Sequence, residues 1–222
     1  MRLRALIAAL FAAVLLVAGA MPAGAVTGGT QFPRASWVKA VMKGKGAWDR
    51  TVVSGSTWDS AEYGVSPARC DLGAYLGGYS SAREAWYDGG LKGSRTVWGE
   101  AQVTVLRYPS TSAAASALTQ VGSYANDCAQ AEEWVCSYCD GGWTAYRTAA
   151  APRRVGEQSV AWRERRVGMG VESARVIATR AGATVVLVDV ARSGDPATMR
   201  TPKYPTWKKA DKIARKALAT AT

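Results

Sequence analysis

The stretch ESARVIATRAGATVVLVDVA, residues 172–191, decides the fold. It holds two segments rich in Val, Ile, Ala and Thr, residues 172–179 and 184–191, which the short Gly-bearing segment 180–183 separates. Two such segments around a short turn predict an antiparallel β-hairpin. The second segment is apolar on both faces, as is typical of a strand that is covered on both sides. We therefore expect residues 184–191 to form a central strand of the sheet.

Other parts of the chain also alternate with a period of two. In residues 95–108, Val103 and Val105 share one face with other small apolar residues, and Trp98 lies on the other face. This pattern predicts a strand with one buried face and one largely solvated face. Further strands are predicted at residues 143–149, at residues 158–166 and around Val52 and Val53.

Helical spacing marks the remaining elements. In residues 111–133 apolar side chains recur every three or four residues, and this buried stripe includes Cys128. Ser110 and Thr111 are candidate N-caps. The other predicted helices are residues 35–43, a short helix from Ser81 through Trp86, and residues 206–219. Helices mixed with hairpin-like strand connections predict an α+β fold, in which helices flank a twisted, largely antiparallel β-sheet.

The N-terminus has the pattern of a secretory signal peptide over residues 1–25. Two arginines precede a continuous apolar or small run, and Ala23-Gly24-Ala25 fits an A-x-A cleavage site. A membrane anchor is the less favoured interpretation, because the apolar run is shorter than the ~20 residues that span a bilayer. We expect residues 26–34 to be a flexible lead and residues 35–222 to form one monomeric domain. That domain would be secreted, either extracellular or cell-wall associated, with no membrane span after cleavage.

The chain is strongly basic, with 28 Lys and Arg against 17 Asp and Glu and a formal charge of +11. This charge favours anionic partners, which outside a cell are wall polymers and lipid head groups more than nucleic acid. The alternative, a solvated surface tuned for solubility, is somewhat favoured.

The sequence contains no histidine. This removes the Ser-His-Asp and Cys-His catalytic machineries and the commonest metal ligand. We expect no enzymatic activity, no metal and no cofactor.

Four cysteines, Cys70, Cys128, Cys136 and Cys139, predict two disulfides in an oxidising compartment, with three formal connectivities. A C-x-x-C pair such as Cys136 and Cys139 can be a redox centre, half of a zinc site or a local disulfide. Redox enzymes place such a pair at the start of a helix, whereas this pair follows a predicted helix and precedes an acidic Gly-Gly turn. A local disulfide is the favoured interpretation.

Aromatic residues supply the candidate ligand contacts, since the chain has nine Trp and nine Tyr but only two Phe. Aromatic faces beside an arginine can stack sugars or bind acidic groups, although core packing is the commoner role of Trp. The candidate ligand-binding residues are Trp98, Trp143, Tyr146, Arg147 and Trp162.

Several carboxylates lie near these candidates. Asp189 interrupts an apolar strand and, if buried, needs a partner such as Arg175. Glu164 lies in a run of arginines. Salt bridges are the favoured role, and a glycosidase-type carboxylate pair is the alternative. Further acidic residues beside the candidate elements are Glu132, Glu133 and Glu157.

Five short motifs over roughly residues 60–220 give the chain a family resemblance. They are Pro67-x-x-Cys70, RYPS at 107–110, NDC at 126–128, VGEQS at 155–159 and the turn at 180–183. With them the chain resembles the extracellular sensor-like domain of mycobacterial transmembrane serine/threonine kinases. Related exported lipoproteins and secreted proteins of actinobacteria share the pattern.

The resemblance implies a twisted antiparallel sheet flanked by helices, two disulfides and a cleft for an unidentified ligand. It also implies that Cys70 pairs with Cys128. In the family the second bridge reaches a later strand, but here the later strands lack cysteine, and Cys136 and Cys139 lie together. Our leading hypothesis is a secreted, non-enzymatic ligand-binding or sensor-like domain. The alternatives are a secreted thiol–disulfide protein that uses the C-x-x-C pair and a cationic wall-associated protein without a pocket.

Overall fold

The computed structural model describes residues 32–56, 64–94, 96–134, 142–168, 170–194 and 201–222. The predicted signal peptide, most of the predicted lead, and Cys136 and Cys139 lie outside these residues. Within them the chain forms one nine-stranded sheet with the order β1-β3-β4-β9-β8-β7-β6-β5-β2, and every neighbouring pair is antiparallel. The strands are β1 (Gly44–Ser54), β2 (Gly64–Ser66), β3 (Ser81–Leu91), β4 (Trp98–Arg107), β5 (Gln130–Trp134), β6 (Trp143–Ala150), β7 (Gln158–Gly168), β8 (Val171–Ala181) and β9 (Thr184–Gly194).

The predicted hairpin lies at the centre of the sheet. Ala181 pairs with Thr184 across a two-residue turn, in which Gly182 has a φ of +55° that favours glycine. β9 pairs with β8 on one side and with β4 on the other, which confirms that it is central. Its side chains alternate between two hydrophobic clusters, so the strand is buried on both faces.

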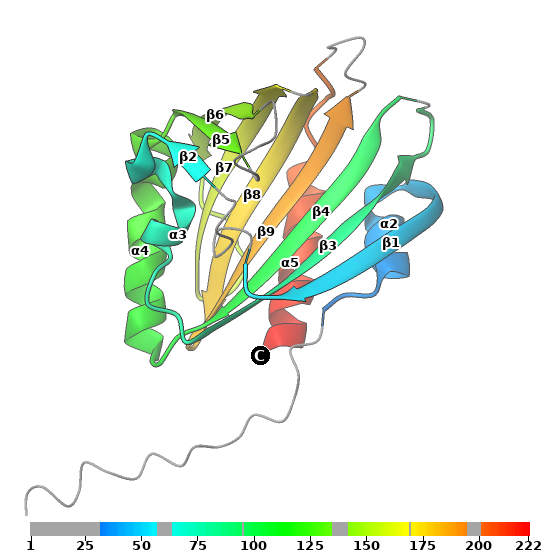
Figure 1. Ribbon diagram of the computed structural model, residues 1–222. Coiled ribbons are helices and arrows are strands. Elements are labelled where there is room, and N and C mark those ends of the chain that lie inside the picture. The colour runs from blue at the N-terminus through cyan, green and yellow to red at the C-terminus, as the bar shows by residue number, and fades with distance from the viewer. Residues whose placement is uncertain (1–31, 57–63, 95, 135–141, 169, 195–200) are drawn as a thin grey trace, which may run out of the picture.

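Helices cover the two faces of the sheet (Figure 1). On one face, α5 (Trp207–Ala221) packs on the even-numbered valines of β9, and α2 (Ala35–Met42) packs beside α5 on β1 and β3. On the other face, α4 (Thr111–Asp127) lies over Val185 and Leu187, and the short α3 (Leu72–Tyr75) packs against α4. Ser110 caps α4, because its Oγ accepts a hydrogen bond from the backbone N–H of Ala113. The α+β prediction with a largely antiparallel sheet is therefore confirmed.

Two predicted helices are wrong in part or in whole. Residues 81–86 belong to β3, whose Ala85 and Tyr87 alternate into the core between β1 and β4. The helix predicted over 111–133 ends at Asp127, and β5 follows at once and pairs with β2 and β6. Tertiary pairing overrides the local helical pattern in both cases.

The face of β4 predicted to be solvated is exposed only at its start. Trp98 is exposed there, whereas Thr104 is fully buried and donates a hydrogen bond of 2.9 Å to Glu84.

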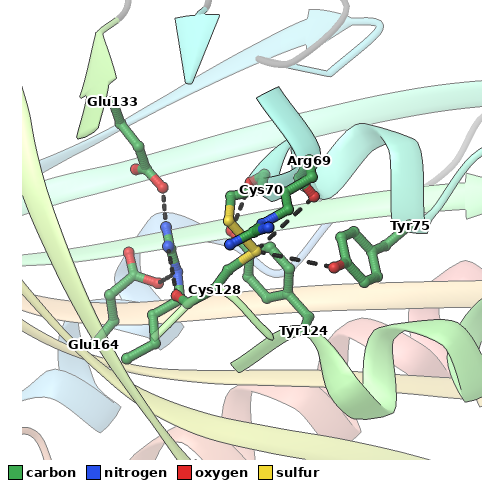
Figure 2. Close-up of a disulfide and its surroundings, with 8 residues drawn as sticks. Arg69, Cys70, Tyr75, Tyr124, Cys128, Glu133 and Glu164 are labelled. Atoms are coloured by element: carbon green, nitrogen blue, oxygen red, sulfur yellow. Dashed lines mark hydrogen bonds and ion pairs between the residues drawn. A yellow bond between two sulfur atoms is a disulfide. The ribbon is translucent and has the colours of Figure 1, made fainter. Parts of the chain in front are cut away.

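One disulfide, between Cys70 and Cys128, ties the 3₁₀ turn η2 (Ala68–Cys70) to the end of α4 (Figure 2). The two Cα atoms are 5.4 Å apart, and both cysteines are buried. Burial of Cys128 was predicted from its place on the apolar stripe of the helix. This confirms the pairing that the resemblance implied. The predicted second bridge falls on residues outside the described part of the chain.

Candidate ligand site on the polar half of the sheet

The sheet face that α4 covers changes from apolar to polar along its strands. On β9, Val185 and Leu187 pack under α4, but Asp189 and Ser193 follow at the same side-chain phase. On β8 the order along the same face runs from Val176 to Glu172. The helix therefore covers one half of this face, and polar side chains occupy the other half.

Strand register gathers the polar side chains. In one row across the sheet, Glu100 on β4 and Glu164 on β7 flank two small residues, Ala191 on β9 and Ala174 on β8. The alanines leave room above the sheet for the longer side chains around them. The neighbouring row contains Ser193, Glu172 and Arg166, which pair successively across β9, β8 and β7. We call this cluster the carboxylate patch; its members are Glu100, Glu164, Arg166, Glu172, Asp189 and Ser193.

Arg166 is the centre of the patch. Its guanidinium donates to Glu164 Oε1 at 2.6 Å, to Asp189 Oδ2 at 2.6 Å and to Glu172 Oε1. The three carboxylates are 3–7% exposed as residues. Ser193 extends the network, because its hydroxyl donates to Glu100 and lies 3.1 Å from Glu172 Oε2. One arginine thus holds three buried acids, and a fourth acid is attached through a serine.

A second arginine ties the patch to the disulfide region. Arg147 is 5% exposed, and its Nε donates to Glu164 at 2.9 Å while Nη2 donates to Glu133. Its Nη1 donates to the carbonyl oxygen of Cys128 at 3.2 Å, and the guanidinium lies 4.9 Å from the ring centroid of Tyr124. Figure 2 shows Glu133 and Glu164 beside the disulfide. Each of the three guanidinium nitrogens of Arg147 therefore donates to an acceptor within the described residues.

The patch carries more negative than positive charge. The pKa of Glu164 is lowered to about 2, because the positive charges of Arg166 and Arg147 outweigh burial, which alone would raise it. Burial, reinforced by Glu172, raises the pKa of Glu100 to about 7. Burial raises the pKa of Asp189 to about 6 in spite of Arg166. The arginines therefore do not fully neutralise the acids at the β4 and β9 side.

One carboxylate oxygen of the patch has no hydrogen-bond donor within the described residues. Asp189 is 7% exposed, and its Oδ1 accepts no hydrogen bond within the described residues, although Oδ2 is bonded to Arg166. A buried carboxylate oxygen without a donor is costly, so this atom marks a place where a ligand donor would be stabilised.

Two exposed tryptophans lie near the incompletely compensated carboxyl of Glu100. Trp98, which precedes Glu100 by one side-chain period on β4, is 55% exposed, and Trp86 on β3 is 39% exposed. Trp86 pairs with Gln102, so it lies one row from Glu100 on the same face. The arrangement places aromatic faces beside carboxylates that lack full compensation.

The structure divides the predicted ligand residues into three groups. Trp98 lies at the patch, and half-buried Trp143 lies on the same sheet face as Arg147. Tyr146 is 45% exposed but lies on the opposite face, because it alternates with Arg147. Arg147 and Trp162 are buried and bonded internally; the indole N–H of Trp162 donates to Glu164 at 3.1 Å. These two residues contact the patch through Glu164.

The partner predicted for Asp189 was wrong, and the reason is strand parity. Asp189 faces the α4 side, where it bonds Arg166. Arg175 pairs with Val190 and faces the α5 side, where its guanidinium lies 4.4 Å from the ring centroid of Trp207. Trp86 and Glu100 were not among the predicted ligand residues. A period-two pattern recognised in both β3 and β4 would have placed the two side chains on one face of the sheet.

The other acidic residues named from the sequence lie apart from Glu100 and Asp189. Glu133 bonds Arg147, Glu132 is exposed on the other face of β5, and Glu157 forms an ion pair with Arg180 at 2.6 Å. Within the described residues, no helix is both long and apolar enough to cross a membrane.

Comparison with known proteins gives matches only among solved structures. No protein-family model and no curated protein sequence matches the chain. The crystal structure of the extracellular domain of PknH from Mycobacterium tuberculosis superposes with a TM-score of 0.60 at 15% identity, over 86% of this chain and 92% of that chain. An uncharacterised Mycobacterium smegmatis protein, the ortholog of Rv0999, gives a TM-score of 0.42 at 10% identity, over 84% and 94% of the two chains. The chain therefore has the fold of the mycobacterial extracellular domain in PknH, as its motifs predicted.

Proposed function

We propose that the chain is an extracytoplasmic, non-enzymatic sensor-like domain. Its ligand would carry a positively charged organic group, such as an amine, that binds at the carboxylate patch. The fold shared with the PknH extracellular domain and the disulfide, which is typical of oxidising compartments, support the location. The absence of histidine from the sequence supports binding over catalysis.

The observation that carries the proposal is the uncompensated charge at one end of the patch. Each guanidinium nitrogen of Arg166 and Arg147 already donates to a protein acceptor. Asp189 Oδ1 accepts no hydrogen bond within the described residues, and the one printed donor to the Glu100 carboxyl is the neutral hydroxyl of Ser193. A network that served stability alone would pair its last buried oxygen. A raised carboxyl pKa beside exposed aromatic side chains is typical of a binding site.

The chemistry of the surrounding groups favours a cation. A carboxylate and an ammonium or guanidinium group form short charge-assisted hydrogen bonds. Trp98 and Trp86 supply aromatic faces that attract a cation by about 0.5–2 kcal/mol each when the cation lies over the ring. Carboxylates and indoles together therefore select an organic cation with an apolar or flat portion.

Binding of such a cation would displace protons. Because the ionised forms of Glu100 and Asp189 would gain a partner, their pKa values would fall from about 7 and about 6 on binding. Affinity should therefore rise with pH across this range and level off when both groups are ionised before the ligand arrives.

A calorimetric and thermal-shift screen of matched pairs tests the proposal. Each probe is an amine, such as an amine-bearing peptide, an amino sugar or a polyamine, and is measured beside its neutral N-acetylated form. We expect at least one amine to bind at least about tenfold more tightly than its acetylated form, and Glu100→Gln to remove the difference. Glu157→Gln is the matched control, since Glu157 is an exposed acid remote from the patch. Equal behaviour of all amines and their acetylated forms would refute the proposal.

A further inference from the structure

We propose that a basic cavity on the α5 side of the sheet is a second ligand site, which binds a phosphate-type oxyanion. The cavity has a volume of about 300 Å³ and lies where the end of α2, the turn between β3 and β4, the end of β9 and the start of α5 meet. Five cationic side chains line it, and none of the residues described as lining it is acidic. The five are Lys43, Lys92, Arg192, Lys203 and Lys209.

A concave surface that carries one sign of charge concentrates the opposite ion. The cations reach the cavity from separate elements: Lys43 follows α2, Lys92 lies in the β3–β4 turn, Arg192 is on β9 and Lys209 is on α5. The fold thus brings together cations that are far apart in the sequence, and a bound anion would relieve their mutual repulsion, which no acid among the described lining residues offsets.

One of the five cations, Lys209, is buried as a residue. Lys209 is 9% exposed, which is rare for lysine, and its Nζ donates to the carbonyl oxygen of Met42 at 2.7 Å. An ammonium group has three N–H donors, so this contact leaves others available at the cavity. Burial, together with Arg192 and Lys43, lowers the pKa of Lys209 to about 8. An anion in the cavity would favour its charged form.

Arg192 supplies the observation that points directly to a ligand. Its Nε is buried and has no hydrogen-bond partner among the described residues, while Nη1 donates to the carbonyl oxygen of Lys203 at 3.4 Å. A buried donor without an acceptor is destabilising. The planar edge of a guanidinium matches two oxygens of a phosphate or similar oxyanion, which would supply the missing acceptor.

The charge and size of the site favour phosphate over a single carboxylate. Five cations exceed what one negative charge compensates, whereas a phosphate monoester carries up to two charges and several acceptor oxygens. The site is also distinct from the carboxylate patch. Arg192 and Ser193 are consecutive on β9 and therefore point to opposite faces of the sheet. A negative result for phosphate binding at the cavity would therefore not bear on cation binding at the carboxylate patch, and the reverse also holds.

The test measures phosphate binding by the full mature chain. Inorganic phosphate and glycerol 3-phosphate are titrated by calorimetry at about 0.1 M salt, which screens weak surface attraction. Co-sedimentation with phosphatidylglycerol vesicles, against phosphatidylcholine vesicles, tests a lipid head group as the source of the phosphate. Two variants probe the cavity: Arg192→Gln, and the double variant Lys92→Gln/Lys203→Gln at two exposed lysines. The control, Lys212→Gln/Lys216→Gln, removes the same charge from the exposed side of α5.

We expect wild type to bind at least one phosphate probe, both cavity variants to weaken binding by about tenfold or more, and the control to change it by less than about twofold. Binding of the soluble esters identifies a free phosphate compound, and binding of anionic vesicles alone identifies a head group. The proposal is overturned if wild type binds neither the soluble phosphates nor the anionic vesicles. It is equally overturned if the control variant weakens binding as much as the cavity variants do, because the effect would then be one of net charge.

Discussion

Replacement of Arg166 by methionine tests whether one guanidinium holds the carboxylate patch together. Methionine has a similar length and an apolar end, so the substitution removes the charge and donors while keeping much of the volume. In wild type the guanidinium bonds Glu164, Glu172 and Asp189, which belong to three different strands. Without it these buried acids face one another, and only Arg147 remains to compensate Glu164.

The size of the effect follows from burial. Loss of one partner of a buried ion pair costs about 3–5 kcal/mol. The Arg166 side chain is 24% exposed, so solvent compensates part of the loss, and we expect about 3 kcal/mol at pH near 8. The lost interactions stabilise ionised carboxylates. The deficit must therefore shrink as the pH falls toward about 5 and the acids become protonated in the folded variant.

Urea unfolding of the oxidised protein at both pH values measures this effect. Arg166→Lys, which keeps a charge, should lie between wild type and Arg166→Met. The control is Arg180→Met, which breaks an ion pair to Glu157, a side chain that is 53% exposed, and should cost no more than about 1 kcal/mol. A loss below about 1 kcal/mol for Arg166→Met, or a loss that does not depend on pH, would show that Arg166 does not hold the buried acids together.

Three further predictions concern stability. Replacement of both Cys70 and Cys128 by serine should lower the free energy of unfolding by about 4 kcal/mol, measured by urea unfolding, because the bridge closes a loop with a sequence separation of 58. The folded pKa of Glu100, about 7, lies above its ordinary value of 4.5, so the folded state binds the extra proton and wild type loses stability as the pH rises through this interval. Glu100→Gln should abolish most of that loss and be the more stable protein near pH 8 in thermal unfolding; an unchanged pH profile would contradict this. Gly156→Ala should destabilise by at least about 2 kcal/mol more than Gly46→Ala, because both glycines have a φ of +65° but only at Gly156 would a Cβ lie 2.4 Å from a carbonyl oxygen of β8.

Much of the fold was predictable because its strongest patterns are local. The strand at β4 and the helix at α5 each show one clear period, and the hairpin of β8 and β9 is marked by two apolar segments around a short Gly-bearing turn. The failures occurred where pairing partners decide the structure. β3 contains Ser81 and a mixed sequence that is compatible with a helix, and only its place between β1 and β4 makes it a strand. β5 continues a helical pattern, and its pairing with β6 ends α4.

The candidate site was predictable only in part, because its members come from four strands whose order is not written in the sequence. Trp98 was found from its solvated phase on β4. Asp189 was recognised as a charge in an apolar strand, but its partner depends on which face of which neighbouring strand it meets. Glu100 and Arg166 carry no local signal, since exposed strands often contain such residues. Their roles follow from the strand register, which places Glu100 in one row with Ala191, Ala174 and Glu164, and Arg166 in the neighbouring row with Glu172 and Ser193.

If the uncompensated carboxyls of the patch receive a cation, binding must displace protons from them, and the number released can be measured. Calorimetry of an amine ligand near pH 6.5, in two buffers with different ionisation enthalpies, counts the protons displaced per ligand bound. Because Glu100 and Asp189 have pKa values of about 7 and about 6, we predict a release of between about half a proton and one proton, which Glu100→Gln reduces to about a quarter or less. Binding without proton release, or with the same release in Glu100→Gln, would contradict the assignment of the patch as the ligand site.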